Sequence, residues 1–186
     1  MKINKITLLR SKYRSFKDRI RILKFKLSGL HVGAKCIIGD IICDWPNKIT
    51  IGDETWIENN VLLKITNPFS EENKIVIGNR VFIGSGAQFN CNTQIIINDD
   101  CLIASNTVFV DAGHEIALGT NINEQALTIA PIVLEKDVWI GTGCIILKGV
   151  VIGEGSVIGA GSLVNKSIPS NQVWAGTPAK FLRNRI

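Results

Sequence analysis

The sequence is short of several features that mark common protein classes. It has two histidines, five cysteines without a CxxC pair, and no apolar run of the roughly 18 residues that a membrane-spanning helix needs. A disulfide framework and a cysteine zinc cluster are therefore not expected. The first residues, MKINKITLLRSKYRSF, hold too short an apolar stretch for a signal peptide, so we expect a cytoplasmic protein.

Acidic residues are scarce in the N-terminal segment. Residues 1–26 contain ten of the 21 lysines and arginines and a single acid, Asp18. The rest of the chain carries 11 basic and 15 acidic residues, so the net charge of +5 originates in this segment. A charge confined to one end is a weak argument for nucleic-acid binding, and we expect no nucleic-acid partner.

What the sequence has in abundance is a six-residue repeat. From residue 134 it reads LEKDVW, IGTGCI, ILKGVV, IGEGSV, IGAGSL and VNKSIP. The same template recurs upstream with slips in phase, from VGAKCI at residue 32 to IASNTV, and it covers most of residues 32–168. The aliphatic residues that open the downstream hexads are Leu134, Ile140, Ile146, Ile152, Ile158 and Val164. Repetition on this scale predicts a solenoid.

The period of six has a simple physical meaning. Six residues make a short strand and a turn, and three such units close a triangular coil of about 18 residues. The opening aliphatic residues point inward and stack from coil to coil, while Gly, Asn and Asp tolerate the backbone angles of the corners. Cys36, Cys101 and Cys144 occupy the small fifth position, which predicts buried filler rather than reactive thiols.

Two stretches interrupt the repeat. One is NPFSEEN at residues 67–73, and the longer is GHEIALGTNINEQAL at residues 113–127. A long excursion from a rigid solenoid is where functional residues tend to gather. We therefore divide the chain into a basic helical segment (1–31), a β-helix (32–168) with an excursion loop at 113–127, and a C-terminal tail (169–186).

The hexads resemble those of the hexapeptide-repeat acyltransferases. The text from NTVFVDAGHEI to WAGTPAK resembles the galactoside and maltose O-acetyltransferases of that superfamily, and also polysaccharide O-acetyltransferases. The resemblance implies an all-β solenoid, a left-handed parallel β-helix, and the left hand comes from the resemblance alone. It also implies an acetyl-CoA-dependent O-acetyltransferase that acts on a sugar hydroxyl in surface-polysaccharide (O-antigen or capsule) synthesis.

His114 opens the long excursion, and the resemblance assigns the catalytic base to this position. A neutral imidazole can take the proton of an attacking hydroxyl near neutral pH. The sequence has no serine or cysteine in a nucleophile elbow, which favours direct transfer over an acyl-enzyme. Asp111, Glu115 or a residue of an adjacent coil could orient the ring. His31 precedes the first hexad and is interpreted as a surface turn residue.

By resemblance, acetyl-CoA is the acyl donor and no metal is required. The N–H of Thr142 is the leading oxyanion donor, the backbone of Ala160 lies along the pantetheine arm, and two basic residues lie near the phosphates. The expected set for coenzyme A is Trp139, Gly141, Thr142, Gly159, Ala160, Lys166 and Arg183. Solvated surface charges remain the alternative for the two basic residues, and a structural aromatic for Trp139.

The acceptor is the least determined part of this interpretation. The residues that resemble the sugar-holding positions are Asn90, Asn92, Asp99 and Asp100, but residues 88–101 are compressed relative to the galactoside enzymes. N-acetylation of an amino sugar and a non-catalytic hexapeptide-repeat scaffold are the alternatives. A carbonic anhydrase of this architecture needs three histidine zinc ligands, and two histidines are too few. In the resembling enzymes the active site lies between subunits, so we expect a homotrimer.

Both ends of the chain suggest helices. An apolar stripe with alternating spacings of three and four predicts an amphipathic helix with basic flanks, and it consists of Ile6, Leu9, Tyr13, Phe16, Ile20, Leu23 and Leu27. One interpretation is that this helix caps the first coil or packs in an oligomer. The alternative is a peripheral contact between residues 1–26 and the inner face of a membrane. A membrane contact would suit a lipid-linked saccharide as the acceptor. Thr177 and Pro178 predict a short C-terminal helix.

Overall fold

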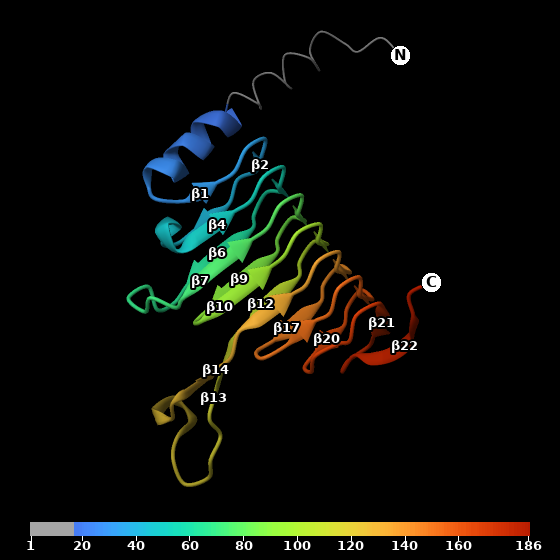
Figure 1. Cartoon of the computed structure of the whole chain (residues 1–186). Coiled ribbons are helices and arrows are strands. Elements are labelled where there is room, and N and C mark those ends of the chain that lie inside the picture. The colour runs from blue at the N-terminus through green and yellow to red at the C-terminus, as the bar shows by residue number, and fades with distance from the viewer. Residues whose placement is uncertain (1–16) are drawn as a thin grey trace.

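The computed structural model describes residues 17–186, and in it the chain winds into a left-handed parallel β-helix, as the hexads and the resemblance predict (Figure 1). Each turn adds one strand to each of three parallel sheets, called A, B and C here. Sheet A contains β1 (His31–Val32), β4 (Ile49–Ile51), β7 (Lys74–Ile77), β10 (Gln94–Ile97), β15 (Ile132–Leu134) and β18 (Val151–Ile152).

The other two sheets follow the same register. Sheet B contains β2 (Ile37–Ile38), β5 (Trp56–Ile57), β8 (Phe82–Ile83), β11 (Leu102–Ile103), β16 (Trp139–Ile140), β19 (Val157–Ile158), β21 (Gln172–Ala175) and β22 (Lys180–Asn184). Sheet C contains β3 (Ile42–Cys43), β6 (Leu62–Ile65), β9 (Gln88–Cys91), β12 (Val108–Val110), β17 (Ile145–Leu147) and β20 (Leu163–Val164). The turns between the sheets form three edges of a prism, named edge AB, edge BC and edge CA.

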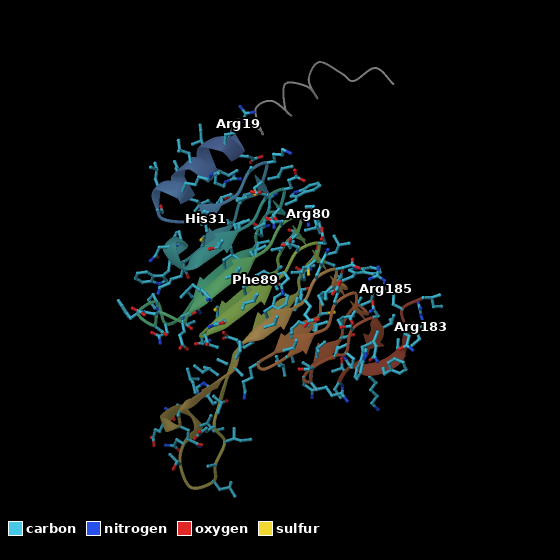
Figure 2. All side chains as sticks on the ribbon, viewed as in Figure 1. Arg19, His31, Arg80, Phe89, Arg183 and Arg185 are labelled. Atoms are coloured by element: carbon cyan, nitrogen blue, oxygen red, sulfur yellow. The ribbon has the colours of Figure 1, made fainter. Side chains whose placement is uncertain are left out.

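The interior is filled by the residues that open the hexads. The inward side chains of the last six hexads are all 1% exposed or less: Leu134, Ile140, Ile146, Ile152, Ile158 and Val164. Phe89, labelled in Figure 2, stacks on Phe109 of the next coil with ring centroids 4.7 Å apart. Cys101 and Cys144 are fully buried, as predicted, whereas Cys36 is only half-buried because it lies in the first coil.

Side-chain oxygens join successive coils along edge AB. The Asp53 carboxylate accepts a hydrogen bond from the N–H of Ala34 at 2.7 Å, and the Asn79 amide oxygen accepts one from the N–H of Asp53 at 2.8 Å. The Asp99 carboxylate accepts the N–H of Asn79 at 2.8 Å. These bonds satisfy corner N–H groups that the sheets do not reach, which explains why Asp or Asn follows the hexad glycine or stands near it.

A helix over residues 17–27 lies across the first coil (Figure 1). Ile22 and Phe25 pack against the core, and Leu30 is buried directly after the helix. Arg21 donates hydrogen bonds to the Ile38 carbonyl at 3.0 Å and to Asp18 at 3.1 Å. The described part of the segment therefore caps the solenoid, while the expected stripe upstream of Ile20 lies outside the described residues. Among residues 17–186, no helix is long and apolar enough to cross a membrane.

The expected C-terminal helix is wrong: residues 172–184 form an antiparallel hairpin of β21 and β22 on the end of sheet B. The last coil needs a cover, and the hairpin provides it by burying Trp174 and placing Phe181 against it. The Thr177 hydroxyl donates to the Gly161 carbonyl at 3.2 Å, so it fastens the turn to the coil beneath instead of accepting a helical N–H. A Thr-Pro pair occurs both at the start of helices and in turns. Here it forms the turn of the hairpin, because the last coil needs to be covered by strands that continue sheet B.

The longest insertion leaves the coil at edge CA as an arm, defined here as residues 112–129 (Figure 1). Its base is an antiparallel pair of β13 (Ala112–His114) and β14 (Leu127–Ile129), and its tip contains the 3-10 turn η2 (Ile122–Glu124). A second 3-10 turn, η1 (Pro46–Lys48), lies at the same edge near the first coil. The Gln125 side chain closes the loop of the arm by hydrogen bonds to the backbone of Ala117 and Thr120.

Candidate active site

The arm is fixed to the coil by Asp111, the residue that precedes it. This carboxylate is fully buried and accepts hydrogen bonds from the N–H groups of Asn92 and Thr93, both at 2.7 Å. It also accepts a weaker bond from the Asn92 amide at 3.3 Å. Both oxygens of Asp111 are therefore engaged by the adjacent coil, and it is not the group that orients His114 in this chain.

His114 is the last residue of β13, and its side chain is exposed at the base of the arm. Opposite it in the pair is Leu127, while the neighbouring Thr128 hydroxyl donates to the Gly113 carbonyl at 3.1 Å. The backbone of Glu115 continues the ladder by donating to the Ala126 carbonyl at 3.0 Å. Within residues 17–186 no hydrogen bond reaches the imidazole, from Glu115 or any other side chain. The backbone on either side of His114 in the sequence is nevertheless fixed, through the hydrogen bonds of Gly113 and Glu115.

Polar and basic side chains line edge CA next to the base of the arm. Asn90 pairs in register with Lys64 on one side and Val110 on the other, and the Thr66 hydroxyl bonds the Asn92 amide oxygen. The stem of Lys148 lies over Gly113, because a Cβ placed on that glycine would approach the Lys148 Cε to 3.2 Å. These residues form the CA-edge cluster: Lys64, Thr66, Asn90, Asn92, His114 and Lys148.

Sequence reasoning found three members of this cluster and missed three. Asn90, Asn92 and His114 were expected, whereas Lys64, Thr66 and Lys148 were not. The signal was present, since Lys64 aligns with Asn90 once the coils are in register. Reading that alignment requires the phase of the repeat across the interruption at residues 67–73, which the sequence does not fix.

Asp99 and Asp100 lie on edge AB, away from the CA-edge cluster. The N–H of Asn79 donates to Asp99 and lowers the pKa of that carboxyl. Arg80, labelled in Figure 2, donates to both oxygens of Asp100 at 2.6 and 3.0 Å and lowers the pKa of this carboxyl too. The structure does not bring these two acids to His114 within one chain, and it gives each a structural partner.

Edge BC carries the glycines that were expected to border coenzyme A. A Cβ on Gly141 would lie 2.6 Å from the backbone nitrogen of Ala160, and one on Gly159 would lie 2.7 Å from the Ala175 Cβ. Both glycines are therefore required for close stacking of the coils. Trp139 stands just before this edge, facing outward from sheet B, with 52% of its surface exposed.

Three successive corner N–H groups on edge BC are free to donate hydrogen bonds to a ligand. In the earlier coils the Asn59 amide oxygen accepts the N–H of Asp40, and the Glu58 carboxylate accepts that of Ser85, whereas among the described residues the N–H of Asn59 has no protein acceptor. In the later coils the equivalent positions are Ser105, Thr142 and Ala160. For the described residues, no protein acceptor bonds the N–H of any of these three. Adjacent coils are about 4.8 Å apart, so edge BC presents a row of evenly spaced donors.

Ser105 was not expected at this site. It occupies the corner position of Thr142 one coil earlier, in the hexad IASNTV. Alanine and asparagine stand there in place of the two glycines that flank Thr142. The register of β11 with β16 identifies the equivalence.

The two expected phosphate-binding residues lie at the C-terminal end of the prism. The Lys166 ammonium is 5.1 Å from the centroid of the Trp174 ring, a cation–π contact that restrains the side chain. Arg183 is exposed on β22, and Figure 2 shows it near the C-terminus together with Arg185. Arg185 differs, because it is engaged with Asp137 at 2.7 Å and with the Gly155 carbonyl at 2.9 Å.

Sheet C separates His114 from the donors of edge BC. Strand β17 (Ile145–Leu147) lies between Thr142, in the turn at edge BC, and Lys148, in the turn at edge CA, so the two corners are roughly 15 Å apart. The arm then projects farther outward from edge CA (Figure 1). Within one chain, the expected base and the expected oxyanion donor therefore do not meet.

Thiol and metal chemistry find no support in the described residues. No group of three His, Cys, Asp or Glu side chains that could hold a metal ion occurs in residues 17–186. Burial raises the pKa of the Cys101 thiol to about 11 and that of Cys43 to about 12, which keeps both protonated at neutral pH.

Comparisons with known proteins agree with the repeat. Two family models match: "Bacterial transferase hexapeptide (six repeats)" at residues 131–166 and "Hexapeptide repeat of succinyl-transferase" at residues 74–112. The chain is 35% identical over 134 residues to the galactoside O-acetyltransferase of Escherichia coli K12, covering 72% of this chain and 63% of that protein. It is 37% identical over 134 residues to the polysialic acid O-acetyltransferase of Escherichia coli O1:K1, covering 70% and 43%. The chain thus spans less than two thirds of the length of these relatives.

Solved structures match over more of the chain. The hexapeptide-repeat acetyltransferase VCA0836 of Vibrio cholerae, complexed with acetyl coenzyme A, is 30% identical with a TM-score of 0.61, covering 89% of this chain and 76% of that one. AntD, an N-acyltransferase of Bacillus cereus in complex with dTDP and 3-hydroxybutyryl-CoA, is 25% identical with a TM-score of 0.74, covering 88% and 87%.

Proposed function

The chain belongs to the hexapeptide-repeat acetyltransferase family, and we propose that it transfers an acetyl group from acetyl-CoA to a sugar hydroxyl. One observation carries the proposal: an exposed histidine lies on edge CA, and a row of N–H donors lies on edge BC. Acyl transfer from a thioester needs a base, an oxyanion donor and positioning, and these two edges supply the first two.

The chemistry follows from these groups. The imidazole of His114 takes the proton of the sugar hydroxyl as its oxygen attacks the thioester carbonyl. The N–H of Thr142 donates to the oxyanion that develops on that carbonyl. The tetrahedral intermediate then expels the coenzyme A thiolate, which receives the proton from the imidazolium, and the acetyl ester remains on the sugar. No enzyme-bound acyl group forms.

The donor binds along edge BC in this proposal. The pantetheine arm contains two amide carbonyls, which accept hydrogen bonds from the corner N–H groups of Ala160 and its neighbours. Gly141 and Gly159 keep the backbone accessible, and Trp139 borders the channel. At the C-terminal end, Lys166 and Arg183 lie where the phosphates of coenzyme A would be neutralised.

The site requires two subunits, since edges BC and CA of one chain are separated by sheet C. We therefore place edge CA of one subunit against edge BC of the next in a cyclic homotrimer. Exposed apolar residues support such a contact: Ile116 is 78% exposed and Leu118 fully exposed on the arm, and Leu102 is 49% exposed beside Trp139 on sheet B. Buried between two subunits, these side chains would add apolar contact to the interface.

The acceptor is a saccharide held by the CA-edge cluster. Asn90, Asn92 and Lys64 offer donors and acceptors suited to ring hydroxyls, and the polysialic acid enzyme among the relatives supports a surface polysaccharide. Transfer to an amino sugar is the second candidate, favoured by the likeness to AntD. In that case a neutral amine attacks the thioester, and the same base takes the proton that the nitrogen loses.

The test is the release of free coenzyme A from acetyl-CoA, followed with a thiol reagent against a panel of neutral and amino saccharides. We expect release that depends on the saccharide, and a product that mild base hydrolyses, as an ester does. A base-stable amide would assign the second candidate. Release no faster with any saccharide than without one would favour a non-catalytic scaffold.

A further inference from the structure

The helix over residues 17–27 has two different faces. Asp18, Arg21, Ile22 and Phe25 are partly buried and face the first coil. At 100° per residue, the opposite face carries Ile20, Leu23 and Leu27, which are 41%, 57% and 81% exposed. We call these three residues the outer stripe. The apolar stripe expected from the sequence is therefore not the face that caps the solenoid.

Basic side chains border the outer stripe on both sides. Lys17 and Lys24 follow one margin of the stripe, and Arg19 and Lys26 follow the other, and all four are exposed. Arg19, Lys24 and Lys26 form no ion pair with any of the described residues. An exposed apolar row between two basic rows is the arrangement that lies in the interface of an anionic bilayer.

The charge of the rest of the chain argues for the same occupant. Outside residues 1–26 acids outnumber basic residues by 15 to 11, so the other surfaces are repelled on average by an anionic surface. The spacing of the stripe continues in the sequence through Phe16, Tyr13, Leu9 and Ile6, together with five further basic residues, all beyond the part that the structure describes. The molecule is thus polarised toward one end.

From this geometry we propose that the outer stripe docks on an anionic phospholipid surface while the opposite face of the helix remains on the coil. The docking goes beyond acetyl transfer and does not depend on it. It would bring the coil to a membrane surface, where a lipid-linked saccharide could be presented to it.

The test uses the full chain and co-sedimentation with phosphatidylcholine vesicles, with and without phosphatidylglycerol, at low and high ionic strength. We expect binding to the anionic vesicles that salt weakens, and little binding to the neutral ones. Leu23→Asn should weaken binding by at least about tenfold, since it removes an exposed apolar side chain that would enter the bilayer interface. Lys24→Gln should weaken it by about fivefold, the loss of one basic contact at an anionic surface.

Matched controls come from the far end of the molecule. Ile186 is fully exposed and Lys180 is exposed on β22, so Ile186→Asn and Lys180→Gln should leave vesicle binding unchanged. Coenzyme A release with a soluble saccharide should be unchanged in all four variants, which separates this proposal from the proposed function. Equal binding to neutral and anionic vesicles, or unchanged binding of Leu23→Asn, would overturn the proposal. So would a fall in the light-scattering mass of Leu23→Asn without vesicles, which would assign the stripe to a contact between copies of the chain.

Discussion

At the scale of single residues, Asp111 links the rigid coil to the arm that carries His114. Its buried carboxylate receives two backbone N–H groups from the preceding coil, so the strand β12 ends at a fixed point. The histidine follows three residues later on a paired strand. A base that must be within hydrogen-bond distance of its substrate depends on this kind of support.

The first prediction follows from the two oxygens of Asp111. Asp111→Asn leaves one oxygen for two N–H groups, so one buried donor loses its acceptor. We expect the free energy of unfolding to fall by about 1–3 kcal/mol and kcat to fall as well. The control is Asp53→Asn, because Asp53 accepts the N–H of Ala34 at an exposed corner of an early coil. Thermal unfolding and steady-state kinetics measure both, and an Asp111→Asn enzyme as stable as the control would remove Asp111 from this role.

At the scale of elements, the hexads determine the coil well and its ends poorly. The inward position of Ile140 or Ile158 follows from the period alone, because each coil repeats the same contact. The C-terminal hairpin was not predictable in this way, since the contact between Trp174 and Phe181 exists only once the last coil is formed. The same holds for the N-terminal helix: its stripe was found, but the burial of Ile22 and Phe25 needed the shape of the first coil.

The candidate site likewise contains residues that local sequence could assign and residues whose position depends on how the coils stack. His114 and Thr142 were assigned because their local sequence resembles the family, and in the structure they are exposed residues on two different edges. Asp99 and Asp100 were grouped with Asn90 because all three resemble sugar-holding positions, but strand β10 of sheet A separates Asn90 from the two acids and carries the chain to the next edge. Lys64 belongs beside Asn90 and is a full coil away in sequence.

A second prediction concerns edge AB. Arg80 lowers the pKa of Asp100, so the ionised pair stabilises the fold above the ordinary carboxyl pKa of about 3.9, and this stabilisation is lost as the pH falls through the lowered value. Asp100→Asn should therefore unfold at a lower temperature than the wild type at pH 7. The difference should vanish in acid and shrink in high salt, because the pair is exposed. A difference that persists when the carboxyl is protonated would show that the pair is not its cause.

At the scale of the whole molecule, the account requires three chains. Light scattering should give a mass of about three times 20.4 kDa. The separation of edges BC and CA also makes a sharper prediction about mixing two inactive variants. His114→Ala disables edge CA, and Ala160→Tyr blocks edge BC with a bulky side chain at an exposed corner.

When the two variants are co-expressed, each mixed trimer contains one interface with both edges intact. Random assembly should restore about a quarter of wild-type activity. Each variant alone, or the two mixed after separate assembly without exchange, serves as the control. Activity that stays absent in mixed trimers of confirmed composition would place the whole site within one chain.

The most direct measurement of the central claim is the turnover of His114→Ala on the acceptor that the saccharide panel identifies. With His114 as the proposed base, kcat should fall by roughly 10²-fold or more while the KM for acetyl-CoA changes little. The rise of kcat/KM with pH that a histidine base produces should disappear in this variant. His31→Ala, which removes an exposed histidine from β1 in the first coil, should behave as the wild type. A His114→Ala enzyme that keeps more than about a tenth of the wild-type kcat would contradict the account, because another group would then have to remove the proton.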